Sequence, residues 1–394
     1  MRRSVAAVLL LLLVSACAEE TQSQLTVASR NLYLGGAIFP VVQAPDAAGV
    51  FVASFQLWSM VQATNFPARA TLIANEIAAT NPDVIGLQEV AKWSVGPPLV
   101  CALDGSGLPV ITSPRASDVR YDFLTLLLTA LQTKGLQYDV ARSTQSFDVE
   151  LCAVDPTGTV APTDVRYTDR DVILVRSGLA TANAAGGLYA AMVEFPVPGT
   201  GTPPVMLPDR RAWNVVEVEK DGQWYRVFET HLEVQELPTP PGVPPYVFQL
   251  AQAGELVGTQ VVPRRIANPI PTIVVGDSNS QAEQPPGSPL RATYDYLTGV
   301  TPFPNLGIPD LDPLVGTRSP LRDAWTATNG TAPGLSWGYS EDLTTGTLSQ
   351  RIDLVLTWDG VPVSMQTFGA DDRTSGTPPL HASDHLGIVA TIRP

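Results

Sequence analysis

Residues 351–356 have the sequence Arg-Ile-Asp-Leu-Val-Leu, and residues 383–392 have the sequence Ser-Asp-His-Leu-Gly-Ile-Val-Ala-Thr-Ile. Each stretch predicts a buried β-strand that begins beside a carboxylate. A carboxylate is costly at such a position unless another group pairs with it. If Asp353 orients His385 while Asp384 faces a metal ion, both stretches are explained together. The alternative is two ordinary strands with polar ends.

Four further apolar stretches end in polar residues of similar kinds. Each predicts a strand followed by a carboxylate, an amide or an imidazole. One such match is weak because polar residues at strand ends are common, but six in sequence order are specific. The four are Thr26–Asn31, which ends in Asn31; Asp83–Val90, which carries Gln88 and Glu89; Val227–Leu232, which carries His231; and Thr272–Asn279, which carries Asp277 and Asn279.

This ordered set resembles the endonuclease/exonuclease/phosphatase superfamily, which includes pancreatic-type deoxyribonucleases, abasic-site endonucleases, bacterial sphingomyelinases and inositol polyphosphate phosphatases. The resemblance extends from about Thr26 to the C-terminus and is strongest to secreted bacterial members. Four motifs follow one another in those members. They are Thr-His-Leu, here Thr230–Leu232; a helix with Gln and Glu, here Gln252–Leu256; Gly-Asp-x-Asn-Ser, here Gly276–Ser280; and Arg-Ile-Asp, here Arg351–Asp353. The residue before Thr-His is usually Asn in relatives and is Glu229 here.

The resemblance implies a fold, a cofactor and a set of roles. The fold would be of the α/β class, a four-layer α/β/β/α sandwich with two packed mixed β-sheets. Mg²⁺, or Mn²⁺ in its place, would be bound by Asn31, Glu89 and Asp384, since hard cations prefer oxygen ligands. The catalytic residues would be His231, Asp277, Asn279, Asp353 and His385.

Phosphoester hydrolysis requires charge neutralisation, an aligned water and a stabilised leaving group. Asp277 and Asn279 would position the water and the phosphate, unless they only cap backbone groups in a turn. His385 would transfer a proton or stabilise the phosphate, and His231 would contact the phosphate or the leaving-group oxygen. The adjacent Arg210 and Arg211 could bind phosphate, but an exposed charge pair is the simpler interpretation.

The N-terminus predicts export. Residues 1–16, with Arg2, Arg3 and an apolar run too short to span a bilayer, have the pattern of a signal peptide. Val-Ser-Ala-Cys at residues 14–17 is similar to a bacterial lipobox, so we expect Cys17 to be lipidated and residues 17–25 to form a tether; an incidental Cys at an ordinary cleavage site is the alternative. Several acyl chains would anchor the protein stably outside the cytoplasm, in the periplasm or at the cell surface.

The remaining cysteines, Cys101 and Cys152, form an even pair in an exported chain, which is compatible with a disulfide; two free thiols are the alternative. The motifs span residues 26–394, so we expect one catalytic domain there. The formal net charge of −14 argues modestly against tight, non-specific binding to nucleic acid, because such binding normally requires a basic face.

Helices and strands alternate along the chain, which favours an α/β fold. Pro- and Gly-rich residues 196–208 and 238–245 predict surface loops that could set substrate choice. We expect helices at Asn65–Thr80, Asp122–Lys134 and Phe248–Val257, and strands that include Tyr138–Ala141, Val172–Val175, Trp213–Val218, Tyr225–Thr230 and Val361–Thr367.

The function predicted from these features is a metal-dependent phosphoester hydrolase acting outside the cytoplasm, most simply a monomeric phosphodiesterase. The substrate, nucleic acid or phospholipid, is undecided by the sequence. The segment around Asp353 lacks the Pro-x-Trp-Cys-Asp-Arg pattern of inositol polyphosphate phosphatases, which argues against that branch. The alternatives are a non-specific nuclease and a non-catalytic binding lipoprotein on the same fold.

Overall fold

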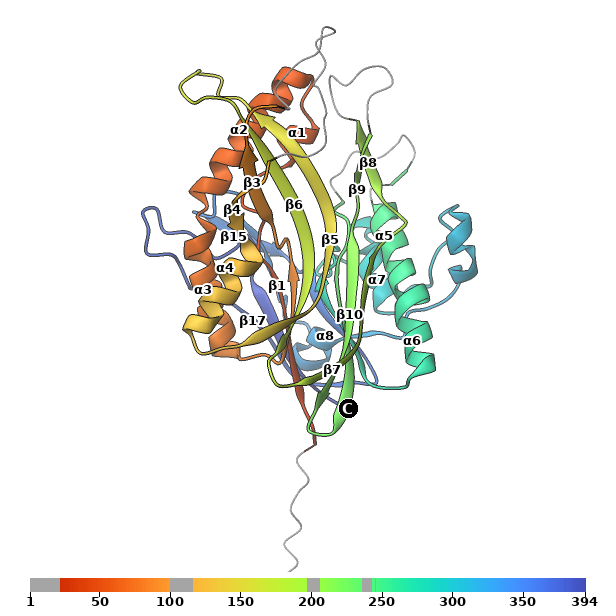
Figure 1. Cartoon of the computed structure of the whole chain (residues 1–394). Coiled ribbons are helices and arrows are strands. Elements are labelled where there is room, and N and C mark those ends of the chain that lie inside the picture. Colours follow the sequence, from red (N-terminus) through yellow and green to blue (C-terminus); the bar gives the residue numbers. More distant parts are fainter. Residues whose placement is uncertain (1–21, 100–115, 197–205, 236–242, 245) are drawn as a thin grey trace, which may run out of the picture.

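A computed structural model describes residues 22–99, 116–196, 206–235, 243–244 and 246–394. Two large mixed β-sheets pack face to face, and helices cover the outer face of each sheet (Figure 1). The predicted α/β class and four-layer arrangement are therefore confirmed. The expected signal peptide and the lipidated Cys17 lie outside the described residues and stay predictions.

The first sheet contains both parallel and antiparallel pairs. Strand β1 runs parallel to β2 and antiparallel to β18. The eight strands lie in the order β17 (Val361–Phe368), β18 (Gly387–Arg393), β1 (Leu25–Asn31), β2 (Val84–Gln88), β6 (Thr163–Arg176), β3 (Lys92–Gly96) and β4 (Asp118–Asp122), with β5 (Tyr138–Ala153) also paired to β6.

The second sheet is mixed as well, since β11 runs parallel to β12 while β16 is antiparallel to β12. Its six strands lie in the order β13 (Arg322–Asp323), β16 (Asp353–Trp358), β12 (Thr272–Asp277), β11 (Gln223–His231), β10 (Ala212–Lys220) and β7 (Ala180–Leu188). Two small antiparallel ribbons are formed by β8 (Val193–Pro196) with β9 (Met206–Asp209) and by β14 (Trp337–Tyr339) with β15 (Gly346–Gln350).

Helices occupy the two outer layers, on opposite sides of the sheets in Figure 1. On the first sheet lie α2 (Ala47–Ala63), α3 (Phe66–Thr80) and α4 (Phe123–Thr133); on the second lie α5 (Tyr246–Glu255), the π-helical η1 (Leu256–Val261), α6 (Val262–Ala267) and α7 (Ala292–Leu297). The shorter helices are α1 (Phe39–Val42), η2 (Pro289–Arg291), η3 (Pro309–Leu314) and α8 (Ala324–Asn329).

The layering follows from the two-residue period of a strand, which sends neighbouring side chains to opposite faces of the sheet. In β1, Val27 packs between the two sheets, whereas Ala28 lies under the helices of the first layer. In β2, Val84 and Ile85 divide in the same way. Both faces are buried, so β2 is apolar up to the polar Gln88 at its end, whereas β1 also buries polar residues such as Ser29 and Arg30.

The predicted helices are confirmed at α3 and α4, and the third overlaps α5 and the start of η1. Two strands are longer than predicted, because β5 and β6 continue past the short apolar runs that signalled them. Helix α2 was not predicted. Part of the first expected loop is also a strand, β9, while residues 197–205 and 236–242 lie outside the described residues.

Cys152 is buried and disulfide-bonded. Cys101 lies outside the described residues, so the pairing of these two cysteines stays a prediction. Among the described residues, no helix combines the length and the apolar character needed to cross a bilayer.

Candidate active site

Three strands of the second sheet place three predicted site residues side by side. In the register of β11, β12 and β16, His231 lies opposite Asp277, and Asp277 lies opposite Asp353. Residues in register on neighbouring strands are about 5 Å apart. His231, Asp277 and Asp353 therefore meet because β11 and β12 end, and the antiparallel β16 begins, at the same edge of the sheet.

The first sheet contributes the next group. Asn31 ends β1 and Glu89 directly follows β2, which pairs with β1 in parallel. The Asn31 amide donates to Glu89 Oε1 at 3.0 Å and to Asp277 Oδ2 at 3.1 Å, so it links the two sheets across the site. Glu89 also accepts from the backbone N–H of Leu34 at 2.6 Å.

Backbone strain accompanies two of these residues. Glu89 has a φ of 52° and Asn279 has a φ of 50°, in the left-handed region that non-glycine residues rarely adopt. Strain of this kind costs about 1–3 kcal/mol per residue and concentrates at functional sites. The fold therefore holds the backbone of Glu89 in a conformation that its residue type does not favour, whereas asparagine adopts this region more readily.

His385 is held by Asp353, as the sequence predicted. His385 Nδ1 lies 2.9 Å from Asp353 Oδ2, which also accepts from the Ser336 hydroxyl at 2.6 Å. Burial alone would lower the pKa of His385, but Asp353, Asp384 and Asp277 raise it to about 10. In the metal-free protein this ring is therefore an imidazolium, with Nε2 3.6 Å from Asp277 Oδ2.

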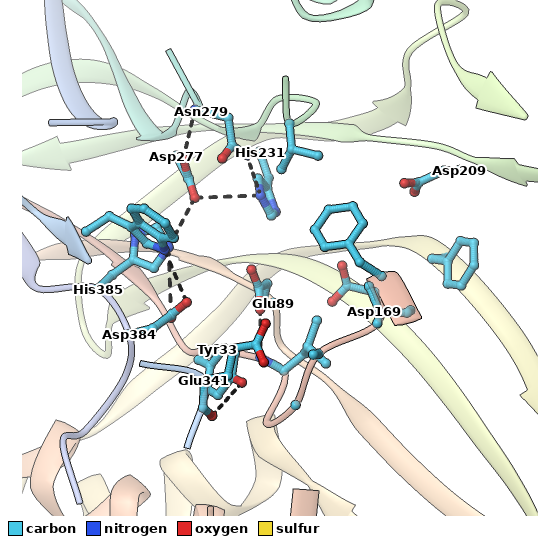
Figure 2. A pocket seen from close by; sticks show the side chains of 18 of the residues that line it. Tyr33, Glu89, Asp169, Asp209, His231, Asp277, Asn279, Glu341, Asp384 and His385 are labelled. Carbon is cyan, nitrogen blue, oxygen red and sulfur yellow. Dashed lines mark hydrogen bonds and ion pairs between the residues drawn. The ribbon is translucent and has the colours of Figure 1, made fainter. Parts of the chain in front are cut away.

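His231 lies on the other side of Asp277, with Nε2 3.7 Å from Asp277 Oδ2 and 3.2 Å from the Asn279 amide nitrogen (Figure 2). Arg211 Nη1 lies 3.1 Å from Nε2 and 3.3 Å from Nδ1 of the same ring. Burial, together with the positive charges of Arg211 and His385, lowers the pKa of His231 well below its usual value. This imidazole is therefore neutral at neutral pH.

The carboxylates of the site repel one another. Burial, followed by the charge of Asp353, raises the pKa of Asp277 to about 7. Burial raises the pKa of Asp384 to about 6, and the charge of Glu89 adds to the effect. A divalent cation would relieve this repulsion, and the oxygen atoms of Glu89, Asp277 and Asp384 form a donor set that suits Mg²⁺.

A second group of possible ligands lies close together, beside the predicted Asn31, Glu89 and Asp384. Asp277, Asp353 and His385 each offer one atom, and these three atoms lie within 4.8 Å of one another. The hydrogen bond between Asp353 and His385 accounts for that proximity without a metal. We therefore keep Glu89 and Asp384 as the expected metal ligands, with Asp277 beside them.

A cavity of about 470 Å³ brings the site together. Asn31 and Asp353 lie behind it and support the residues in front, whereas the other six predicted residues line it: Glu89, His231, Asp277, Asn279, Asp384 and His385. Figure 2 shows Asp277 between the two histidines, with Asp169 and Asp209 farther along the cavity. The lining also includes the aromatic side chains of Phe39, Phe147, Tyr167 and Phe195.

The departure from the family pattern at Glu229 leaves His231 in place. Glu229 is fully buried and accepts hydrogen bonds from the side chains of Gln88, at 2.9 Å, and Asn214, at 2.8 Å. Burial raises the pKa of Glu229 to about 8, so its carboxyl group is mostly protonated at neutral pH. The position therefore carries a satisfied, neutral side chain.

Several cavity residues were missed by the sequence analysis, among them Trp337, Asp169 and Asp209. The indole of Trp337 donates to Asp384 Oδ2 at 3.3 Å, and Asp169 and Asp209 line the cavity. Arg211 corrects the expectation of an exposed charge pair: its side chain is only 14% exposed and lines the cavity, whereas Arg210 is exposed. The only sequence signal was the Arg210-Arg211 pair, which does not say which arginine points inward.

Residues 59–385 match the model of the endonuclease/exonuclease/phosphatase family. No curated protein matches the chain.

Solved structures match over nearly the whole chain. A family protein from Bacteroides thetaiotaomicron is 14% identical with a TM-score of 0.52, covering 94% of this chain and 98% of its own. A mannosyl-6-phosphatase from Bacteroides thetaiotaomicron VPI-5482 is 14% identical with a TM-score of 0.52, covering 93% and 99%. A family protein from Beutenbergia cavernae DSM 12333 is 20% identical with a TM-score of 0.48, covering 94% and 72%. The two structures with a TM-score of 0.52 show a shared fold. Because the family match spans most of the sequence, the chain belongs to the endonuclease/exonuclease/phosphatase family.

Proposed function

We propose that this protein is a Mg²⁺-dependent phosphodiesterase that acts outside the cytoplasm, with Mn²⁺ able to replace Mg²⁺. The observation that carries the proposal is the arrangement in one cavity of Glu89, Asp277 and Asp384 beside the Asp353–His385 pair. Family members hydrolyse phosphoesters, and this cavity supplies the groups that such a reaction needs.

The metal ion, when bound by Glu89 and Asp384 with support from Asn31, would supply charge neutralisation at the phosphoryl group. The remaining roles belong to the chain. Asp277 accepts hydrogen bonds within the site and would orient the attacking water, because its Oδ2 lies between the two imidazoles. The Asn279 amide would donate to a phosphoryl oxygen beside it.

The two histidines are suited to different tasks. His385 is held by Asp353 through Nδ1, so a proton on Nε2 would be donated to a phosphoryl or leaving-group oxygen while Asp353 fixes the orientation of the ring. His231 is neutral and would contact the phosphate or leaving-group oxygen without adding charge. A neutral and a charged imidazole on opposite sides of Asp277 would divide the polar contacts to the substrate.

Nuclease activity is the second candidate, because the same site chemistry would cleave a nucleic-acid diester. The acidic net charge and the acidic cavity favour a smaller substrate over a polyanion. The fold likeness to a mannosyl-6-phosphatase also makes sugar phosphates worth testing as monoesters. A non-catalytic binding protein would keep the fold but show no turnover.

The test is a panel of bis-p-nitrophenyl phosphate, p-nitrophenyl phosphate, a hexose 6-phosphate, plasmid DNA, RNA and sphingomyelin, with Mg²⁺, Mn²⁺ or EDTA. We expect diester turnover only with a divalent cation. The His385→Ala variant should lose about 1,000-fold in kcat, in the upper range for a general acid or base. His381→Gln is the matched control, because His381 is a buried histidine that does not line the cavity. Equal rates in EDTA, or a fully active His385→Ala protein, would refute the proposal.

We also propose that a lipid on Cys17 holds the enzyme to a membrane. The support is the Val-Ser-Ala-Cys run after an apolar leader. Labelled palmitate should be incorporated by cells that express the wild-type chain and not by cells that express Cys17→Ser. Equal labelling of both proteins would exclude this anchor.

A further inference from the structure

Arg211 is the cavity residue whose role the family motifs do not explain. It directly precedes β10, and its guanidinium is 14% exposed within the cavity wall. Burial alone would lower the pKa of Arg211, but Glu233 and Asp209 raise it above its usual value, so the group is charged. The neighbouring Arg210 is exposed and does not line the cavity.

Glu233 fixes one side of this guanidinium. Its Oε1 accepts from Arg211 Nε at 3.1 Å and from Nη2 at 2.8 Å. Glu233 is itself fully buried, and its backbone is held by α5: the Glu233 N–H donates to Gln252 at 2.8 Å, and Gln249 donates to the Glu233 carbonyl at 2.8 Å. Glu233 therefore binds Nε and Nη2, and Nη1 is the remaining nitrogen of the guanidinium.

That nitrogen points to the reacting end of the cavity. Nη1 lies 3.1 Å from His231 Nε2, the atom that also lies 3.2 Å from the Asn279 amide and 3.7 Å from Asp277 Oδ2. A phosphoryl oxygen that contacts His231 would therefore also lie within reach of Arg211. A guanidinium binds such oxygens in a fixed geometry that a lysine cannot reproduce.

The charge of the cavity makes a contact between Arg211 and a phosphoryl oxygen important for substrate binding. Among the described residues that line it, Arg211 is the one lysine or arginine side chain, facing six acids: Glu89, Asp169, Asp209, Asp277, Glu341 and Asp384. An anionic phosphoryl group is repelled by these carboxylates, even when one or two are neutralised by a metal. Arg211 supplies the fixed positive charge that lies at the His231 end.

We propose that Arg211 is a catalytic residue of this site, with Nη1 binding a non-bridging oxygen of the substrate phosphoryl group beside His231, and that Glu233 is its positioning residue. The inference rests on the proposed phosphoester hydrolysis and deepens it. A purely structural arginine would only neutralise Glu233 and Asp209, and its loss would change stability without changing phosphate binding.

Two measurements test Arg211 with the full mature chain. The first is kcat/KM for bis-p-nitrophenyl phosphate, and the second is the affinity for inorganic phosphate, measured by calorimetry with saturating Mn²⁺. We expect Arg211→Ala to lose about 100- to 1,000-fold in kcat/KM, the effect of removing one fixed donor to a developing oxyanion. Phosphate affinity should fall at least about 10-fold, as expected for a lost charged hydrogen bond. Arg211→Lys should recover only a small part of either loss, because it keeps the charge without the planar geometry.

Arg210→Ala is the matched control and should keep both values, because this arginine is exposed. Mn²⁺ affinity and the melting temperature of Arg211→Ala should show that the protein is folded and loaded. A folded Arg211→Ala protein with wild-type phosphate affinity would overturn the proposal. Phosphate binding does not depend on turnover, so it tests Arg211 even if the wild-type protein hydrolyses no diester and the proposed function fails.

Glu233 is tested by comparing two variants. Glu233→Gln keeps an oxygen that can accept from Arg211 and should keep phosphate affinity within about 5-fold, whereas Glu233→Ala frees the guanidinium and should approach the Arg211→Ala value. Recovery by Gln separates a positioning role from a general loss of stability. Wild-type phosphate affinity in Glu233→Ala would refute the positioning role and leave the Arg211 contact to its own test.

Discussion

The two histidines of the cavity lie on either side of Asp277 and have opposite electrostatic surroundings. His385 is bonded to Asp353 and faces two further carboxylates, which raise its pKa to about 10. His231 is buried against a guanidinium, and its pKa is lowered well below the usual value. Both rings are 3–4% exposed, so burial alone does not distinguish them. The charged group beside each buried imidazole therefore decides whether the ring is a cation that can donate or a neutral contact.

The same contrast appears at the level of the two sheets. The loop before β18 in the first sheet carries His385, but the second sheet provides Asp353 to hold it. The second sheet carries both His231 on β11 and Arg211 beside β10. The carboxylate bonded to the charged imidazole therefore comes from the opposite sheet, whereas Arg211, the cation beside the neutral imidazole, comes from the same sheet as His231.

The largest effect should come from breaking the His385 side of the comparison at Asp353. Asp353→Asn removes the charge that raises the pKa of His385, so the ring should lose its proton at a lower pH and its orientation should loosen. We expect kcat for the diester to fall about 100-fold, within the range of acid–base contributions. In the metal-free protein, ring nitrogen chemical shifts should show the His385 pKa moving down toward 6.5.

Ser336→Ala is the control for that variant. It removes one hydrogen bond to Asp353 Oδ2 and keeps the charge, so its effect should be about 10-fold or less. If Asp353→Asn and Ser336→Ala had the same activity and the same His385 titration, the charge of Asp353 would not be the cause of the difference between the histidines.

A smaller effect should follow from His231→Gln. The neutral imidazole offers a polar contact that glutamine can partly replace, so we expect kcat/KM to fall about 10-fold. The informative value is the ratio between the activity loss of His231→Gln and the activity loss of His385→Ala. Equal losses for the two variants would show that the two histidines have similar roles despite their different surroundings.

The smallest effect concerns the third histidine, His381, which lies outside the cavity and serves as a reference. It is buried and stacks on Tyr339 with ring centroids 3.4 Å apart, and burial, with the charge of Arg373, lowers its pKa to about 4. The unfolded chain therefore binds more protons between pH 6.5 and 4. Stability contributed by the neutral ring is present above pH 6.5 and is lost as the pH falls toward 4.

His381→Gln should flatten that part of the stability curve without changing diester turnover at neutral pH. One proton can contribute a slope of at most about 1.4 kcal/mol per pH unit. Denaturant unfolding of both proteins at several pH values measures the difference. An unchanged slope between pH 6.5 and 4 would show that His381 titrates normally in the folded protein.

Much of the site could be predicted because its residues lie at, or directly beside, the ends of buried strands. An apolar strand that is buried on both faces leaves few places for Asn31, Glu89 or Asp277 except its end, and the ends of neighbouring strands meet. The predicted helices α3 and α4 carry a similar local signal, with apolar residues on one side and a clear start or stop. The structure of these parts of the molecule follows from short stretches of the sequence.

Helix α2, in contrast, could not be predicted from its local sequence pattern. Its buried residues, which include Val50, Leu57 and Val61, follow helical spacing. The positions between them are also largely apolar, so the sequence shows no clear alternation of apolar and polar residues at helical spacing, and no helix was predicted. Packing against the outer face of the first sheet, together with Asp46 at the N-cap, settles the structure there.

The amino-acid sequence determined which residue types reach the edge of the sheets and in what order, because strand period and burial act over a few residues. Tertiary structure alone decided other partners: that Arg211 points inward while Arg210 does not, and that Glu229 accepts hydrogen bonds from Gln88 and Asn214. Those choices depend on contacts between segments far apart in the chain. Charge and hydrogen bonding at the site are therefore properties of the packed sheets rather than of any one motif.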